Sequence, residues 1–215
     1  FGDNPMKQFF SALLLIGCSF TPSLQAADNA AGKALYAATC VACHGAQGQG
    51  NPALASPALA GQQAAYLQRQ LMNFRSDQRG TAPGDTGGVQ MLAMAKGLAD
   101  DAAVTAVADY LASLPASKAE PSMDGGDAAH GAKLYQSKCG SCHGGKGEGN
   151  PALNSPRLAG LSDSYLQTQF NNFKQGKRGY EKQDRYGRQM KMMANTVNEK
   201  EFEDVLAYLN TLGAN

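Results

Sequence analysis

Residues 40–44 read Cys-Val-Ala-Cys-His, and residues 139–143 read Cys-Gly-Ser-Cys-His. Two cysteines separated by two residues and followed directly by a histidine form the attachment pattern of haem c. In this pattern both thiols must reach the vinyl groups of one porphyrin, and the adjacent histidine must lie under the iron. The sequence therefore predicts two covalently attached haems. The predicted thioether cysteines and first axial ligands are Cys40, Cys43, Cys139, Cys142, His44 and His143.

Zinc is the principal alternative for these cysteines, because Cys-x-x-Cys pairs also bind zinc. A site with four cysteines, or with two cysteines and two histidines, would need ligands from both motifs, which lie 99 residues apart. That separation is outside the compact spacing of zinc sites. The remaining cysteine, Cys18, lies near the N-terminus, so no cysteine pair is left for a structural disulfide.

The same offset of 99 residues relates much of the chain around the two motifs. Gly-Asn-Pro-Ala-Leu occurs at residues 50–54 and again at 149–153. Leu-Ala-Gly occurs at residues 59–61 and again at 158–160. A solenoid would need more copies with a shorter period. The repeat therefore indicates two copies of one domain.

The boundary between the copies lies in residues 115–127, PASKAEPSMDGGD, whose composition is typical of a linker. We expect one domain over residues 27–115 and a second over residues 116–215. Apolar residues recur at helical spacing in both, whereas no long stretch alternates with a period of two. These patterns predict an all-α fold, in which a few helices of each domain wrap around its haem, because a unit this small has a thin core of its own. The clearest stripes are Val104, Val107 and Leu111, and Phe202, Val205 and Leu209.

The second axial ligand of each iron is expected to be a methionine brought in from a downstream loop, as in class I cytochromes, which use Met/His ligation. Met91 and Met190 each lie 47 residues after the histidine of their copy. Met94 and Met193 are paired by the repeat equally well, so the repeat alone does not choose between the two sets. Core packing is the alternative role for any of these methionines.

Two further pairs of residues lie where they would support a haem. Pro57 and Pro156 each follow their histidine by 13 residues, where a backbone carbonyl would accept a hydrogen bond from the imidazole Nδ1 and orient the ring. A simple turn is the alternative role for these prolines. Arg79 and Arg178 would contact haem propionates through charge-assisted hydrogen bonds, or else lie solvated at the surface.

The N-terminal stretch has the pattern of a secretory signal peptide. From Met6 it contains one lysine, a short apolar run over residues 9–16 and a polar segment that ends at Ala26. Residues 1–26 are therefore expected to be a leader that directs export to the periplasm. Alternatively, the Leu-Ile-Gly-Cys sequence that ends at Cys18 is a lipobox, and a lipid on this cysteine would attach the protein peripherally to a membrane.

With these features in place, the chain resembles the cytochrome c4 family of dihaem class I cytochromes. The resemblance covers the chain after the leader and rests on the paired haem motifs, on Ser-Pro-x-Leu-Ala-Gly at residues 56–61, and on a methionine seven residues before Leu98 and before Val197. It implies that Met91 and Met190 are the axial ligands, and that prolines 57 and 156 supply the carbonyls for the histidines. It also implies that the first helix of each copy crosses the last helix closely at Gly32 and at Gly131.

The resemblance implies an electron carrier that receives electrons from a quinol-oxidising cytochrome bc-type complex and delivers them to a terminal oxidase or reductase. One alternative is a dihaem redox enzyme, either peroxidase-like or thiosulfate-oxidising, and another is the electron-transfer subunit of a dehydrogenase. Catalysis at a haem needs an open or labile ligand position. Both copies have a methionine at the same place and no spare cysteine or histidine beside it, which favours a carrier over an enzyme.

The formal net charge of +1 gives no support for nucleic-acid binding. The charge is unevenly divided, with five basic and six acidic residues in 27–115 but thirteen basic and eleven acidic residues in 116–215. Within the second domain, residues 174–191 contain seven basic residues and only two acidic ones. A basic rim beside Met190 would steer an acidic redox partner. A solvated loop is the alternative.

Overall fold

The structure, a computed structural model, describes residue 2 and residues 24–213. Most of the expected leader, including Cys18, therefore lies outside the described residues. Within the described residues the chain forms helices joined by loops, with no strand beyond two isolated bridges, Asn51–Ser56 and Asn150–Ser155. The predicted all-α class with two tandem units is confirmed, and no helix of this region is long and apolar enough to cross a membrane.

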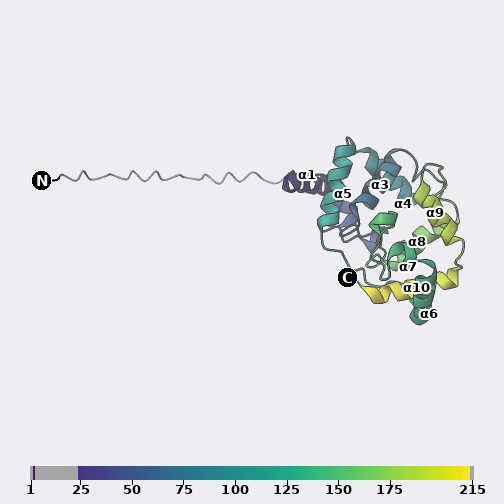
Figure 1. Cartoon of the computed structure of the whole chain (residues 1–215). Helices are drawn as coiled ribbons and strands as arrows, with labels where there is room; N and C mark the ends of the chain where they lie inside the picture. Colours follow the sequence, from purple (N-terminus) through teal and green to yellow (C-terminus); the bar gives the residue numbers. More distant parts are fainter. Residues whose placement is uncertain (1, 3–23, 214–215) are drawn as a thin grey trace.

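Each unit repeats the same order of helices (Figure 1). The first unit contains α1 (Leu24–Thr39), α2 (Val41–His44), η1 (Pro52–Leu54), α3 (Ala64–Arg75), α4 (Thr86–Lys96) and α5 (Asp101–Ser113). The second contains α6 (Ala128–Lys138), α7 (Gly140–His143), η2 (Pro151–Leu153), α8 (Asp163–Lys174), α9 (Arg185–Ala194) and α10 (Glu199–Leu212). The purple-to-teal helices of the first unit lie beside the green-to-yellow helices of the second (Figure 1).

The first and last helices of each unit pack directly on one another, α1 on α5 and α6 on α10. A Cβ at Gly32 would overlap the backbone carbonyl of Ala106, and a Cβ at Gly131 would overlap that of Asp204. Only glycine lets the two backbones approach this closely, as the family resemblance implied. The long helices α5 and α10 bury the predicted stripes, with Val104 and Val205 among the least exposed side chains.

Helices α4 and α9 are the main departure from the sequence-based expectation, because the methionines were expected on loops. Both helices begin after an aspartate whose side chain accepts a hydrogen bond from a backbone N–H three residues later, from Gly88 to Asp85 and from Gly187 to Asp184. An N-cap of this kind satisfies an otherwise unpaired donor of the first turn. The helices were missed because glycines weaken the helical pattern, two of them in α4 and one in α9.

The linker between the units is held by a buried carboxylate. Asp163, at the start of α8, is fully buried. Its oxygens accept the backbone N–H groups of Ser122 and Met123 at 2.8 and 2.9 Å. Asn210 of α10 donates to the same carboxylate at 3.2 Å. The linker is therefore held against the second unit at Ser122 and Met123.

Candidate haem sites and the interface between them

Each Cys-x-x-Cys-His motif forms a short helix that follows a longer one. Cys40 lies between α1 and α2, and its carbonyl accepts the backbone N–H of His44 at 3.0 Å. Cys139 and His143 form the same contact at 2.9 Å. All four motif cysteines are free thiols, so neither pair is closed as a disulfide. Burial raises the pKa of Cys40 and that of Cys139 to about 11. A raised pKa keeps the thiols of Cys40 and Cys139 protonated, which disfavours their use as thiolate ligands for a metal.

Both motif histidines are buried and held by the same hydrogen bond. The Nδ1 of His44 lies 2.9 Å from the carbonyl oxygen of Pro57, and the Nδ1 of His143 lies 2.9 Å from that of Pro156. A carbonyl can only accept, so Nδ1 carries the proton and Nε2 keeps its lone pair. Burial lowers the pKa of both histidines, which favours the neutral imidazole that binds a metal. The proline carbonyls thus orient each ring for coordination through Nε2.

A large solvent-open cavity lies against the second motif. The empty space along its walls amounts to about 1490 Å³, part of which is open to solvent. Its walls are mostly apolar, as a porphyrin requires. In the second unit they include Cys139, Cys142, His143, Met190 and Met193. The cavity also reaches the first unit, where Tyr66, Leu67 and Gln70 line it. Thiols, a lone pair on imidazole and an apolar cavity together fit a covalent haem.

The methionines of the second site lie one helical turn apart on α9. Met190 and Met193 both line the cavity. Met190 is partly buried and packs on the apolar core, whereas Met193 is 40% exposed. In the first unit Met91 is partly buried and Met94 is 44% exposed. Burial therefore distinguishes Met91 and Met190 from the more exposed Met94 and Met193.

Arg79 and Arg178 are buried between the two units, 8% and 6% exposed, so the alternative of solvated surface arginines is wrong. The Oε1 of Gln70 accepts from both guanidinium groups, at 2.7 Å from Arg79 and 3.1 Å from Arg178. The Oε1 of Gln169 does the same, at 2.8 Å from Arg178 and 3.1 Å from Arg79. Two arginines and two glutamines thus form a closed, nearly symmetric ring, which we call the arginine ring.

The arginine ring concentrates positive charge in a buried place. Burial, followed by repulsion from Arg178, lowers the pKa of Arg79. Burial alone would raise the pKa of Tyr66, yet the charges of Arg178 and Arg79 lower it. No ion pair joins either arginine to a carboxylate within the described residues, and the Nε of Arg79 has no hydrogen-bond partner there. Unpaired buried cations are costly, so this place is suited to an anionic group such as a haem propionate.

Sequence reasoning did not single out the two glutamines of the ring. Gln70 and Gln169 are related by the offset of 99 residues, so the repeat contained the signal. The repeat does not show that each glutamine contacts the arginine of the other unit as well as that of its own. Other contacts across the interface join Gln62 to the backbone of Arg157 and Arg69 to Asn154.

Comparison with protein families gives a match to cytochrome c over residues 29–115 and again over residues 128–213. Cytochrome c4 of Azotobacter vinelandii is 31% identical over 93% of this chain and 96% of its own. The thiosulfate dehydrogenase electron acceptor of Thiomonas intermedia is 39% identical, over 66% of this chain and 65% of its own length.

Solved structures resemble the whole two-unit arrangement. Reduced recombinant cytochrome c4 from Pseudomonas stutzeri superposes with a TM-score of 0.69 at 29% identity, covering 86% of this chain and 98% of that one. A thiosulfate dehydrogenase from Marichromatium purpuratum also gives a TM-score of 0.69, at 31% identity, over 85% of this chain and 40% of that one. With two cytochrome c matches, two haem c motifs and relatives aligned end to end, this chain belongs to the cytochrome c4 family of dihaem c-type cytochromes.

Proposed function

We propose that this dihaem electron carrier works in the periplasm, where it receives electrons from a quinol-oxidising cytochrome bc-type complex and delivers them to a terminal oxidase or reductase. The observation that carries the proposal is the duplication of one set of candidate ligands. Each copy has a buried histidine whose ring is held by a proline carbonyl. Each copy also has a partly buried methionine, on α4 in the first unit and on the equivalent helix α9 in the second. Two equivalent sites, each with a histidine and a methionine for the two axial positions, suit electron transfer rather than catalysis. The leader expected over residues 1–26 supports export.

We assign the thioether bonds and the axial ligands to residues of the two repeated sites. In the first unit Cys40 and Cys43 form the thioether bonds. In the second unit Cys139 and Cys142 do so. The haem iron, when bound, supplies reversible one-electron chemistry. The axial ligands are His44 and Met91 in the first unit and His143 and Met190 in the second.

The chain's own groups set the conditions for that chemistry. The carbonyls of Pro57 and Pro156 keep the proton on Nδ1 and hold the imidazole planes, which limits rearrangement at the metal when its charge changes. The mostly apolar walls of the second site suit the apolar faces of a porphyrin. The arginine ring places fixed positive charge where propionates from either unit would be stabilised through charge-assisted hydrogen bonds.

A second candidate function is favoured by the comparisons. The relative from Thiomonas intermedia is a thiosulfate dehydrogenase electron acceptor, and a thiosulfate dehydrogenase has the same two-unit fold over most of this chain. In this alternative the chain accepts electrons from a thiosulfate-oxidising enzyme, as a partner or subunit. The haem sites would be the same, and only the electron donor would differ.

The experiment that tests the carrier assignment is the near-infrared spectrum of the oxidised holoprotein, quantified per haem. A methionine-to-ferric-iron charge-transfer band of full intensity for two haems is expected. Met91→Ala and Met190→Ala should each remove half of it, whereas the matched variants Met94→Ala and Met193→Ala should leave it intact. Half intensity in the unmodified protein would mean that one iron lacks methionine, and the redox enzyme would then replace the carrier.

A separate measurement distinguishes the two electron donors. The rate of haem reduction is compared with a cytochrome bc-type complex plus quinol and with a thiosulfate dehydrogenase plus thiosulfate. Faster reduction by the quinol-oxidising complex is expected. Reduction by thiosulfate dehydrogenase alone would assign the chain to thiosulfate oxidation.

A further inference from the structure

The helices that carry the methionines occupy equivalent places in the two units but present different surfaces. On α9 the outward positions hold Arg185 and Arg188, both exposed, and Lys191, which is partly exposed. The equivalent positions on α4, offset by 99 residues, hold Thr86, Val89 and Leu92. At these three positions α9 therefore has three more positive charges than α4, although the repeat relates the two helices.

The segment before each helix extends this difference. Residues 174–191 contain seven basic residues and two acidic ones, whereas the equivalent residues 75–92 contain two of each. Of the two acidic residues, Asp184 is buried as the N-cap of α9. Among the described residues, none of the exposed or partly exposed cations of 174–191 forms an ion pair within 4.0 Å. The surface therefore keeps a net positive charge, since Glu181 is the one acidic residue of the segment that is not buried.

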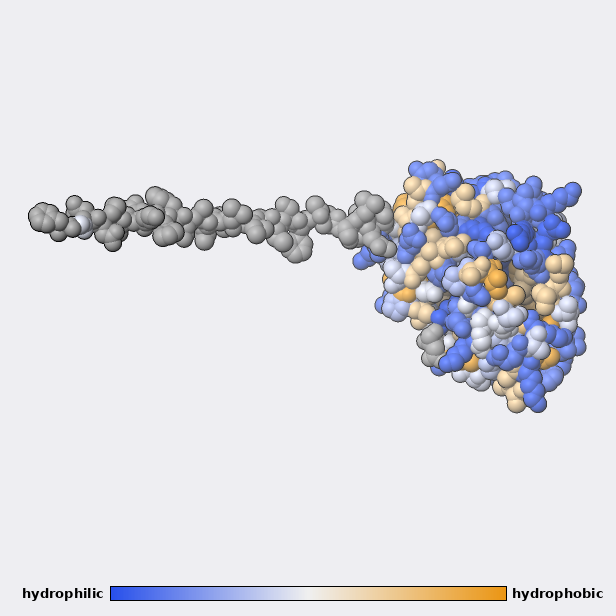
Figure 2. Space-filling view, viewed as in Figure 1, coloured by the Kyte–Doolittle hydropathy of each residue, from blue (hydrophilic) through white to orange (hydrophobic). Residues whose placement is uncertain are grey.

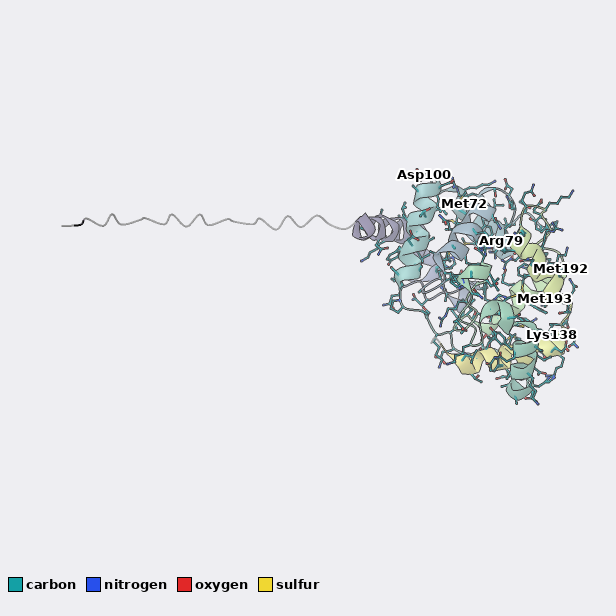
Figure 3. All side chains as sticks on the ribbon, viewed as in Figure 1. Met72, Arg79, Asp100, Lys138, Met192 and Met193 are labelled. Atoms are coloured by element: carbon teal, nitrogen blue, oxygen red, sulfur yellow. The ribbon has the colours of Figure 1, made fainter. Side chains whose placement is uncertain are left out.

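The charged surface lies beside the cavity of the second unit. Tyr186, Gln189 and Met193 of α9 line that cavity, so the same helix has one face toward the haem site and the other toward solvent. Met193 lines the cavity and is 40% exposed, and its neighbour Met192 is 66% exposed. Figure 3 labels both methionines on α9 at the right-hand edge of the molecule. A partner on this surface is thus separated from the cavity by one side-chain layer.

The mixture of cations and exposed methionines has the character of a protein-docking surface. Figure 2 shows a mostly hydrophilic face on which hydrophobic residues form small separate patches, without one broad apolar surface. Electrostatic steering, rather than extensive apolar burial, is the means by which such a surface attracts a transient partner. Methionine side chains adapt to different partner surfaces.

We propose that α9 and residues 174–185 form the docking surface for an acidic redox protein, which exchanges electrons with the haem of the second unit. This proposal rests on the proposed electron-carrier function and adds an assignment to it: the second unit takes the acidic partner, whereas the first unit, whose α4 lacks the three cations, does not. The two units therefore differ in the partner that their methionine-bearing helices can bind.

The test exchanges the outward residues of α9 for those of α4 in the triple variant R185T/R188V/K191L. The charge-matched control is K33A/K118A/K133A, which removes three exposed lysines that do not line the cavity. The probe is an acidic flavodoxin in its anionic hydroquinone form. Each productive encounter passes one electron from the hydroquinone, which becomes the neutral semiquinone without proton transfer, to a ferric haem, which becomes ferrous.

At low ionic strength we expect the α9 variant to be reduced about tenfold more slowly than the unmodified protein, within the range of electrostatic steering. The difference should shrink at about 0.5 M salt, because salt screens exposed charges. The lysine control should change less than about twofold. Calorimetric titration with oxidised flavodoxin, in which no electron passes, should show weaker binding to the α9 variant only.

Equal rates for the α9 variant and the unmodified protein would overturn the proposal, and so would an equal loss in the lysine control, since net charge alone would then be responsible. Haem content and thermal melting are recorded for each variant. If the triple variant loses haem, the single variants R185T and R188V are compared with K33A in the same assay. Absence of haem from the unmodified protein would instead refute the carrier function, so the two failures are distinguishable.

Discussion

Gln70→Leu tests whether the arginine ring holds the two units together. The Oε1 of Gln70 accepts hydrogen bonds from Arg79 at 2.7 Å and from Arg178 at 3.1 Å. Hydrogen bonds with charged groups contribute about 1.5–3 kcal/mol each, so losing both costs about 3–6 kcal/mol. The buried leucine recovers about 1.5–3 kcal/mol of this through apolar burial. We therefore expect a net loss of roughly 1.5–3 kcal/mol of stability.

The assay is thermal unfolding of the holoprotein, followed by circular dichroism. For a chain of this size, a loss of about 1.5–3 kcal/mol lowers Tm by about 3–12 °C. Gln169→Leu should lower Tm by a similar amount, because Gln169 makes the matching pair of contacts. The control is Gln175→Leu, an exposed residue at the end of α8, which should leave Tm nearly unchanged. A change in Tm below about 1 °C for Gln70→Leu would refute the stabilising role of the arginine ring.

Two glycine variants, measured by chemical denaturation, should change stability in opposite directions. Gly131→Ala should lower it by about 1–3 kcal/mol, because the added methyl overpacks α6 on α10. Gly87→Ala should raise it by about 1 kcal/mol, because the added Cβ meets nothing within 4 Å and alanine favours the helix. Hydrogen bonds from His130 and from the linker backbone lower the pKa of Asp204 from 3.8 to about 2. The ionised carboxylate therefore contributes fully to stability above about pH 4, and this contribution is lost as pH falls toward about 2. Asp204→Asn should remove that part of the acid dependence of Tm, and an unchanged dependence would contradict the role of Asp204. Asp163→Ala should speed proteolytic cleavage within residues 115–127, because the linker loses its anchor; equal cleavage rates would show that the linker is held by other contacts.

Local patterns in the sequence were sufficient for the haem attachment sites and for the class of fold. A Cys-x-x-Cys-His motif contains the two thiols and the imidazole within five residues, so no long-range contact is needed to recognise it. The fixed offset of 99 residues established two copies, and the helical stripes of Val104, Val107 and Leu111 marked a core helix. These features depend on spacing along the chain, which the sequence displays directly.

Tertiary structure decided how the two copies meet. Arg79 contacts Gln169 across 90 residues and Arg178 contacts Gln70 across 108 residues, pairings that no local pattern contains. Whether these arginines lie in solvent or inside depends on the packing of two units, and only the assembled interface buries them. The helical state of α4 and α9 likewise depends on caps and packing more than on periodicity. Spacing identified the haem attachment sites, because the two thiols and the imidazole of each lie within five residues of the chain. Burial and the contacts between the units followed from the fold, because the residues that make them come from distant segments.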